Sequence, residues 1–219
     1  MYSFTDKYNY DQPTIKGLSQ HIVDNESKIH IIPNGFDTNF WIRQKKKRDI
    51  SFITVASGLN PGNIIYYLKG INLMVKLAKM LPSHLFAIVG WEKNLKMANN
   101  SNIINYPHLD KLQLLELYSR SRFYLQLSKS EGFPNSLCEA MLCECTPIVS
   151  NITSMPEIIA DTGYIIEKPN VNNLFNTVQT ALENTDFYNK EARNVIVSNF
   201  SIDNRAHLLN ELIQLKDPK

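Results

Sequence analysis

The sequence predicts an α/β fold built on an open, doubly wound sheet of parallel strands. After about residue 50, short apolar runs alternate with segments of helical periodicity, as in parallel strands joined by crossover helices. Residues 51–57 are mostly apolar, which is typical of a strand buried on both faces. Residues 70–81 repeat apolar side chains at helical spacing, namely Ile71, Leu73, Met74, Leu77 and Leu81.

In chain order, the apolar runs predict strands at residues 51–57, 85–90, 103–106, 123–128, 147–150 and 164–167. The intervening segments predict helices at residues 70–81, 111–119, 135–143, 156–160, 172–183, 186–198 and 203–215. In open sheets of this kind, ligands bind in the crevice outside the carboxyl ends of the strands. A binding site is therefore expected in the loops that follow the strands.

The first 37 residues do not follow this alternation. We expect a helix at residues 11–21, a strand at residues 28–32 and a turn at Asn34-Gly35. The rest of the chain is expected to divide into a principal domain, residues 38–200, and a carboxyl-terminal helix, residues 201–219.

The composition allows one good-sized domain and argues against several classes of function. The chain has 219 residues, of which 43% are hydrophobic, and a net charge of +2. This content is sufficient for a sizeable core. A nucleic-acid-binding protein normally has a much stronger basic bias, so nucleic acid is not an expected partner. Apolar runs such as FAIVGW and FYLQL are far shorter than the roughly 20 residues needed to cross a bilayer.

The cysteines and the first residues favour a cytoplasmic protein. Cys138, Cys143 and Cys145 are crowded into one predicted helix and turn, so we expect buried thiols rather than disulfides or a metal site. Met1 leads into a polar stretch, YSFTDKYNYDQ, which is unlike a signal peptide. A basic cluster, KKKR at residues 45–48, is expected to be a solvated loop; a contact with anionic lipid on the inner face of the membrane is the alternative.

Two glutamates define the clearest candidate site. Glu131 and Glu139 lie eight positions apart, across the junction between a predicted strand and a predicted helix. Gly132 and Pro134 break the chain after the strand, and the helix then begins near Asn135. Its amino terminus exposes unpaired N–H groups between the two carboxylates. An anionic sugar derivative fits this arrangement.

The same residues resemble the E-x7-E motif of the group-one family of retaining glycosyltransferases, which have the GT-B fold. The segments that carry the resemblance follow in the family's order: IIPNGFD at 31–37, YLKGINLMVKLAKMLP at 67–82, EGFPNSLCEAM at 131–141, TPIVS at 146–150 and MPEII at 155–159. The resemblance extends over residues 28–182. It implies that residues 38–200 are the Rossmann-like, donor-binding, carboxyl-terminal half of a GT-B fold. Residues 1–37 would then be the tail of an amino-terminal domain and the hinge.

The resemblance also implies an activity. A sugar would move, with retention of its anomeric configuration, from a nucleotide-diphosphate sugar to an acceptor hydroxyl, in the synthesis of a surface glycan or glycoconjugate. The implied donor is a UDP- or GDP-sugar, and the implied acceptor is a glycan or a lipid-linked molecule. An amino-terminal domain, in cis or in trans, would bind the acceptor. No metal and no cofactor are implied.

The resemblance assigns the chemistry to Lys69 and Glu131. Lys69 precedes a predicted helix and would bind the diphosphate; as a mere surface residue, a cation at this position would oppose the helix dipole. Glu131 would contact the hydroxyls of the donor sugar, although without the resemblance it is more typical of a turn residue. The family usually has arginine after the glycine that follows the first strand, whereas this chain has Gly58-Leu59. One phosphate contact of the family is therefore not expected here.

The remaining implied residues surround the nucleotide. Glu139 would accept hydrogen bonds from the ribose hydroxyls; by composition alone it is an exposed helix residue. The other residues implied at the donor site are Gly132, Phe133, Pro134, Asn135, Ser136, Gly58 and His108, the last of them beside the base. The family commonly has glycine in the turn where this chain has Glu144.

The sequence leaves one alternative function open and disfavours several others. A nucleotide-sugar-binding subunit or degenerate relative, inactive without a partner domain, remains the alternative. A GT-B epimerase or phosphorylase is disfavoured because the chain has no catalytic histidine set or cofactor lysine motif. The chain also has no G-x-G-x-x-G after a strand, no G-x-x-x-x-G-K-[ST] and no G-x-S-x-G, which disfavours a dinucleotide enzyme, a P-loop protein and a serine hydrolase.

Overall fold

The computed structural model describes residues 30–92, 102–184 and 189–216. Within these ranges, six parallel strands form one sheet in the order β3-β2-β1-β4-β5-β6. The strands are β1 (Ile50–Leu59), β2 (Phe86–Trp91), β3 (Ile103–Pro107), β4 (Ser121–Gln126), β5 (Thr146–Ser150) and β6 (Tyr164–Ile166). The α/β fold with a doubly wound parallel sheet is thus confirmed.

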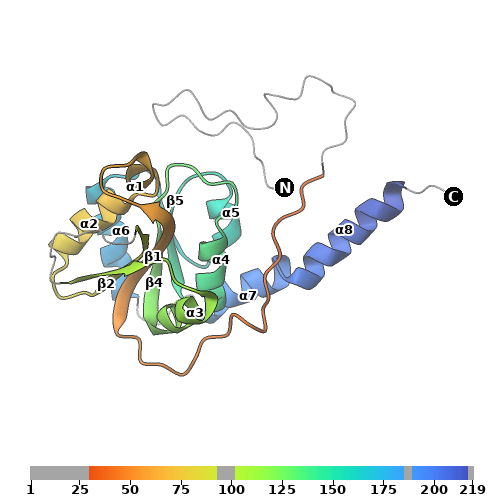
Figure 1. The fold of residues 1–219 in the computed structure, drawn as a ribbon, viewed down its shortest axis with the longest axis horizontal. Coiled ribbons are helices and arrows are strands. Elements are labelled where there is room, and N and C mark those ends of the chain that lie inside the picture. Colours follow the sequence, from red (N-terminus) through yellow and green to blue (C-terminus); the bar gives the residue numbers. More distant parts are fainter. Residues whose placement is uncertain (1–29, 93–101, 185–188, 217–219) are drawn as a thin grey trace, which may run out of the picture.

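Helices cover both faces of the sheet (Figure 1). They are α1 (Ile64–Leu68), α2 (Ile71–Met80), α3 (Lys111–Arg120), α4 (Asn135–Leu142), α5 (Met155–Ile159), α6 (Val171–Glu183), α7 (Asn189–Asn199) and α8 (Ile202–Lys216). Residues of α2 and α6 pack in one hydrophobic core, and residues of α3, α4, α5 and α7 pack in another. The sheet lies between these two cores, and α8 projects away from them.

The strands supply alternate residues to the two cores. Phe52, Phe86 and Phe123 belong to the α2–α6 core, where the ring of Phe52 stacks on the other two at 4.8 and 5.4 Å between centroids. Their neighbours Ile53 and Tyr124 belong to the opposite core and are fully buried. The central strands therefore have no solvent-facing side, which explains why their sequences are almost continuously apolar.

The direction of winding reverses at β1. The chain proceeds outward from β1 to β2 and β3, then returns to place β4 on the other side of β1. In sheets of this topology, the loops after the two strands at the reversal point diverge and leave a crevice. The loops that follow β1 and β4 are therefore the expected walls of a ligand site.

From β1 onward, the predicted strands and helices are present in the described residues, with ends displaced by one or two positions. The helix predicted at 186–198 begins outside the described residues, and α7 is described from Asn189. The strand predicted at 123–128 begins two residues earlier and ends at Gln126, so Ser128 belongs to the following loop. Helix α1 was not predicted, because its five residues, IIYYL, are too few to show a helical period.

The prediction for the segment before β1 was wrong where it can be compared. Residues 30–32 form no strand, and the turn lies at residues 38–40 rather than at Asn34-Gly35. Phe36 pairs with Ser201 in a parallel bridge, which keeps the backbone extended there. Gly35 does not form a turn. It allows the backbone to lie close to the start of α8, because a Cβ on it would be 2.9 Å from Ile202 Cα. The helix predicted at 11–21 lies outside the described residues.

In the described part of the chain, three non-glycine residues have the positive φ that favours glycine: Glu144, Thr153 and Ala160. Glu144 has φ 61° in the turn between α4 and β5, which explains why glycine suits this position. Ala160 ends α5 with φ 47° and ψ −130°, a combination that a Cβ strongly disfavours. The Ala160 side chain is exposed, so it gains no packing in return.

We predict that Ala160→Gly raises the free energy of unfolding by about 1 kcal/mol, because relief of strain outweighs the added flexibility of the unfolded chain. Urea unfolding monitored by circular dichroism measures this change. The matched control is Ala206→Gly, at an exposed position inside α8, which should lower stability by roughly 0.5–1 kcal/mol. A decrease of equal size in both variants would mean that Ala160 is not strained.

Candidate active site

An ion pair joins the two loops at the reversal point of the sheet. Lys69 Nζ lies 2.6 Å from Glu131 Oε1. Lys69 lies between α1 and α2, in the connection after β1, and Glu131 lies in the loop after β4. The two residues to which the resemblance assigned the chemistry are therefore in direct contact.

The backbone around this pair is packed unusually closely. Gly70, next to Lys69, has φ +67°, and a Cβ on it would lie 2.2 Å from the carbonyl oxygen of Leu127. In the loop after β4, the N–H of Lys129 donates to the carbonyl of Leu68 at 2.8 Å. Only glycine allows α2 to begin this close to the end of β4. This contact brings Lys69 within reach of Glu131.

Two buried polar side chains also contact Glu131. Gln126 Nε2 and Ser128 Oγ donate to Oε1 of Glu131, at 2.9 and 2.6 Å. Sequence reasoning did not identify either residue, because Gln126 lies inside an apolar run and Ser128 in what was predicted to be the same strand. The available indication was the polar side chain of Gln126 within FYLQL, since a buried amide must find hydrogen-bond partners.

Helix α4 begins beside the pair without a side-chain cap. Its first turn therefore has N–H groups available for an anion. A Cβ on Gly132, in the loop before the helix, would meet no atom within 4 Å, so this loop faces open space. The ring of Phe133 packs on Phe36 and Phe200, which leaves its backbone as the part that could approach a ligand. Pro134 is buried at the amino terminus of α4.

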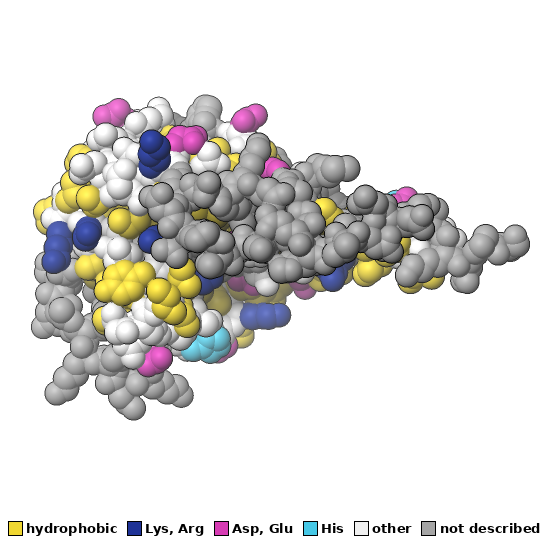
Figure 2. Space-filling view, turned by 90° about the horizontal axis from the view of Figure 1, so that it is seen from above, with side chains coloured by type: hydrophobic (Ala, Val, Ile, Leu, Met, Phe, Trp, Pro, Cys, Tyr) yellow, Lys and Arg dark blue, Asp and Glu magenta, His cyan; other side chains and the backbone are white. Residues whose placement is uncertain are grey.

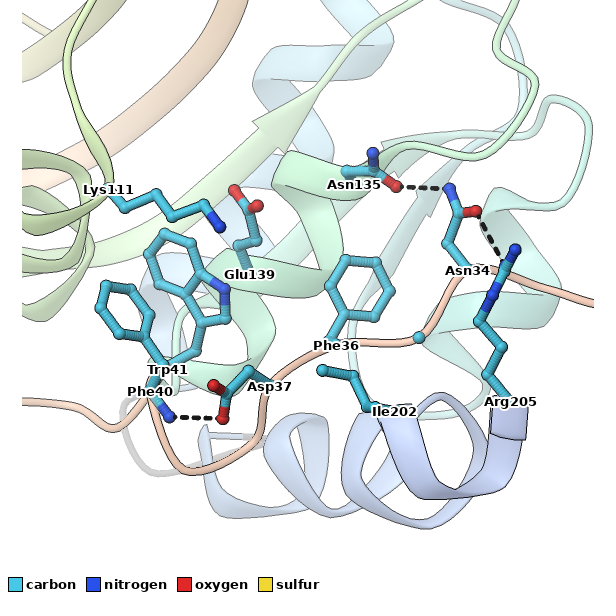
Figure 3. A pocket seen from close by; sticks show the side chains of 11 residues that line it. Asn34, Phe36, Asp37, Phe40, Trp41, Lys111, Asn135, Glu139, Ile202 and Arg205 are labelled. Carbon is cyan, nitrogen blue, oxygen red and sulfur yellow. Dashed lines mark hydrogen bonds between the residues drawn. The ribbon is translucent and has the colours of Figure 1, made fainter. Parts of the chain in front are cut away.

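Glu139 lies in the wall of a separate hollow of about 530 Å³ (Figure 3). Lys111 of α3 points toward Glu139, and Trp41 lies on the same side of the hollow. At the other end, Asn135 accepts a hydrogen bond from Asn34, whose side-chain oxygen in turn accepts from Arg205. The segment before β1 and the start of α8 thus form part of the wall, which sequence reasoning did not indicate.

Burial raises the pKa of Glu139 from 4.5 to about 7. Desolvation is the main cause, and the charge of Lys111 and the nearby hydroxyl of Tyr118 partly oppose it. Near neutral pH, both the protonated and the ionised form of Glu139 are therefore populated. Composition alone predicted that Glu139 is an exposed helix residue, and this prediction was wrong.

Two of the implied positions are not connected to these groups. Gly58, near the end of β1, has φ +67°. Its carbonyl accepts a hydrogen bond at 2.8 Å from Nδ2 of Asn63, which lies in the loop after β1. The next residue, Leu59, is fully buried, so the position where the family has arginine supplies core packing and no charge. His108 is exposed after β3, and the described hydrogen bonds do not join it to Lys69, Glu131 or Glu139.

The surface around α1 carries both hydrophobic and charged side chains (Figure 2). Seen from the side of α1, hydrophobic side chains lie next to separate Lys or Arg side chains (Figure 2). Helix α1 itself exposes Ile64 and Tyr67.

The three cysteines are buried and free, as predicted. Burial raises the pKa of the Cys145 thiol to about 12, with Arg48 partly opposing the shift, so this thiol is neutral at physiological pH. The described part of the chain has no group of three or more His, Cys, Asp and Glu that could hold a metal ion. Among the same residues, no helix is both long and apolar enough to cross a membrane.

Comparison with solved structures identifies the architecture. Sucrose-phosphate synthase from Thermosynechococcus elongatus is 16% identical, with a TM-score of 0.75 over 90% of this chain and 54% of that one. The carboxyl-terminal domain of LpcC, a glycosyl transferase group 1 protein from Francisella tularensis, is 16% identical, with a TM-score of 0.62 over 77% of this chain and 100% of that one. Anabaena HepE, solved in complex with UDP-glucose, is 15% identical, with a TM-score of 0.70 over 84% of this chain and 57% of that one. The fold is that of the Rossmann-like, carboxyl-terminal half of a GT-B protein.

Sequence comparison gives the family. The family model described as "Glycosyl transferases group 1" matches residues 42–199, and the chain therefore belongs to this family. Serotype-specific mannosyltransferase WbdA from Escherichia coli is 29% identical over 140 residues, which are 63% of this chain and 17% of that protein. O-antigen chain mannosyltransferase B from Escherichia coli is 36% identical over 55 residues, 25% of this chain and 14% of that one. The chain thus matches only a small part of the length of these relatives.

We predict that ionisation of Glu139 destabilises the empty fold. Because its pKa in the folded chain, about 7, lies above 4.5, the native state binds more protons than the unfolded state between these pH values. Stability therefore falls as pH rises through this window, by about 3 kcal/mol. Glu139→Gln should not show this loss. Urea unfolding of both proteins between pH 4.5 and 8 measures the difference.

Lys111→Met gives an independent check, because loss of the cation should raise the pKa of folded Glu139 further, so that the fall in stability becomes larger and extends to higher pH. Parallel curves for the parent and Glu139→Gln would show that Glu139 is not perturbed by burial.

Proposed function

We propose that the described residues are the donor-binding half of a retaining glycosyltransferase that uses a nucleotide-diphosphate sugar. The observation that carries this proposal is the Lys69–Glu131 pair, which lies at the reversal point of the sheet beside the uncapped amino terminus of α4. A cation and a helix amino terminus together suit a diphosphate. The shared fold of HepE, solved with UDP-glucose, supports a donor of this class.

Each residue then has a defined role. Lys69 and the first N–H groups of α4 bind the diphosphate. Glu131 presents its second oxygen, Oε2, to the hydroxyls of the sugar. Glu139 in its ionised form accepts from the ribose hydroxyls, so binding of the nucleotide is coupled to loss of its proton. His108, after β3, and Gly58, near the end of β1, border the nucleotide.

The reaction proceeds with little help from a side-chain base. The bond between the anomeric carbon and the departing phosphate oxygen breaks through an oxocarbenium-like state. The acceptor oxygen bonds to the anomeric carbon from the face that the phosphate leaves, and its proton passes to the departing phosphate. Lys69 and the helix N–H groups stabilise the negative charge that develops on the diphosphate.

The relatives favour particular substrates. WbdA and O-antigen chain mannosyltransferase B are both named as mannosyltransferases, which favours a mannosyl donor and a surface glycan as product. An amino-terminal domain, in cis or in trans, would bind the glycan or lipid-linked acceptor. The reaction would take place in the cytoplasm, with the exposed lysines at 45–47 in a solvated loop; a contact with the inner face of the membrane is the alternative.

We predict that Lys69→Ala weakens binding of UDP or GDP by about 10- to 100-fold, while the corresponding monophosphate loses much less. The reason is loss of one charge-assisted hydrogen bond and exposure of the phosphates to the unpaired charge of Glu131. Isothermal calorimetry measures both affinities. Lys76→Ala, on the exposed side of α2, is the matched control and should bind like the parent. Equal diphosphate affinity in Lys69→Ala and the parent would refute the phosphate role.

We also predict that the isolated chain binds donor but transfers sugar negligibly. Holding the acceptor hydroxyl near the anomeric carbon can supply roughly 7–11 kcal/mol, and the described residues form one wall of the cleft. Transfer should appear when an amino-terminal domain is supplied, and Glu131→Ala should abolish it. Mass spectrometry detects the product, and NMR gives its anomeric configuration.

An inverted product would contradict retention, and efficient transfer by the isolated chain would contradict the need for a second wall. Donor binding without transfer in the complemented protein would instead favour a nucleotide-sugar-binding subunit.

A further inference from the structure

The two oxygens of Glu131 are in different environments. Oε1 accepts from three donors: Lys69 Nζ at 2.6 Å, Gln126 Nε2 at 2.9 Å and Ser128 Oγ at 2.6 Å. No hydrogen bond to Oε2 is present among the described residues. The carboxylate is therefore held by one oxygen, and the other is left for a ligand.

The two neutral donors are buried and are themselves fixed in place. Gln126 is 4% exposed and Ser128 is fully buried. Gln126 Nε2 also donates to Ser128 Oγ at 2.8 Å, and Gln126 Oε1 accepts from the hydroxyl of Tyr124 at 3.0 Å. That hydroxyl also lies 2.7 Å from Ser136 Oγ, in the first turn of α4. The amide of Gln126 is thus held in the orientation that points its N–H groups at Glu131.

The third donor, Lys69, is more exposed and is needed elsewhere during binding. Its side chain is 31% exposed, against 11% for Glu131. A bound diphosphate would compete with Glu131 for the ammonium group, because it carries more charge than one carboxylate. If Lys69 turned to the phosphates, Glu131 would lose its only charged partner among the described residues. Gln126 and Ser128 would then be what holds it.

We propose that Gln126 and Ser128 are positioning residues for Glu131, which keep its Oε1 fixed while Lys69 binds the diphosphate, so that Oε2 stays directed at the donor sugar. This inference rests on the proposed function, in which Glu131 contacts the sugar. It adds that the contact between sugar and Glu131 depends on two neutral side chains that touch neither sugar nor phosphate.

The test compares binding of GDP-mannose with binding of GDP, by calorimetry. Gln126→Met keeps the approximate length of the side chain and removes its hydrogen bonds. It should reduce the preference for GDP-mannose over GDP by about five- to tenfold, with GDP affinity unchanged or higher. Ser128→Ala should have an effect in the same direction. Ser121→Ala, which removes a buried hydroxyl at the opposite end of β4, should leave the preference unchanged.

A double-mutant cycle with Glu131→Ala separates positioning from general packing. Once Glu131 is absent, Gln126→Met should change the preference by less than about twofold, because its effect acts through that carboxylate. The same loss of preference in both backgrounds, or an unchanged preference in Gln126→Met alone, would overturn the inference.

The cycle is repeated on urea unfolding without ligand, which keeps this inference distinct from the proposed function. Failure of the parent to bind GDP, UDP or their sugars would refute the proposed function. If the changes in unfolding free energy caused by Gln126→Met and Glu131→Ala are not additive, Gln126 stabilises Glu131 in the folded chain. Additive changes would overturn the inference.

Discussion

The close contact between the loops after β1 and β4 is the constraint on which the site depends. The sheet reverses its winding between these strands, and Gly70 allows α2 to begin against the carbonyl of Leu127. Lys69 and Glu131, 62 positions apart in sequence, are brought to ion-pair distance as a result. A side chain at position 70 would separate the loops, because its Cβ would overlap the backbone of Leu127, which follows β4.

The two glutamates of the motif show how one residue type serves two roles. Glu131 is nearly buried, yet three donors satisfy one of its oxygens, which offsets the cost of removing a charge from water. Glu139 is also largely buried but has only the charge of Lys111 and the nearby hydroxyl of Tyr118 to compensate, so its pKa rises to about 7. Glu131 is thus held in place by three donors, whereas burial raises the pKa of Glu139 into the neutral range.

Much of the fold was predictable from the sequence because the sheet is buried on both faces. Runs such as residues 51–57 and 123–128 could hardly be anything but central strands, and the structure places them at β1 and β4. Helix α1 escaped prediction because five residues show no period. The positions of Glu131 and Lys69 followed from the motif, whereas the role of Gln126 could not. The hydrogen-bond partners of Gln126 are Tyr124, Ser128 and Glu131, and only the folded loop brings them together.

The wall of the hollow beside Glu139 was the least predictable part, because distant segments build it. Phe36 pairs with Ser201, Arg205 donates to the carbonyl of Pro33, and Arg193 donates to the carbonyls of Thr38 and Trp41. These contacts join residues more than 150 positions apart, and local patterns carry no information about them. A boundary at residues 37 and 38, or at 200 and 201, would cut through this pairing. The surroundings of Glu139 therefore depend on both the segment before β1 and the start of α8, and residues 38–200 alone would lack part of the wall of this hollow.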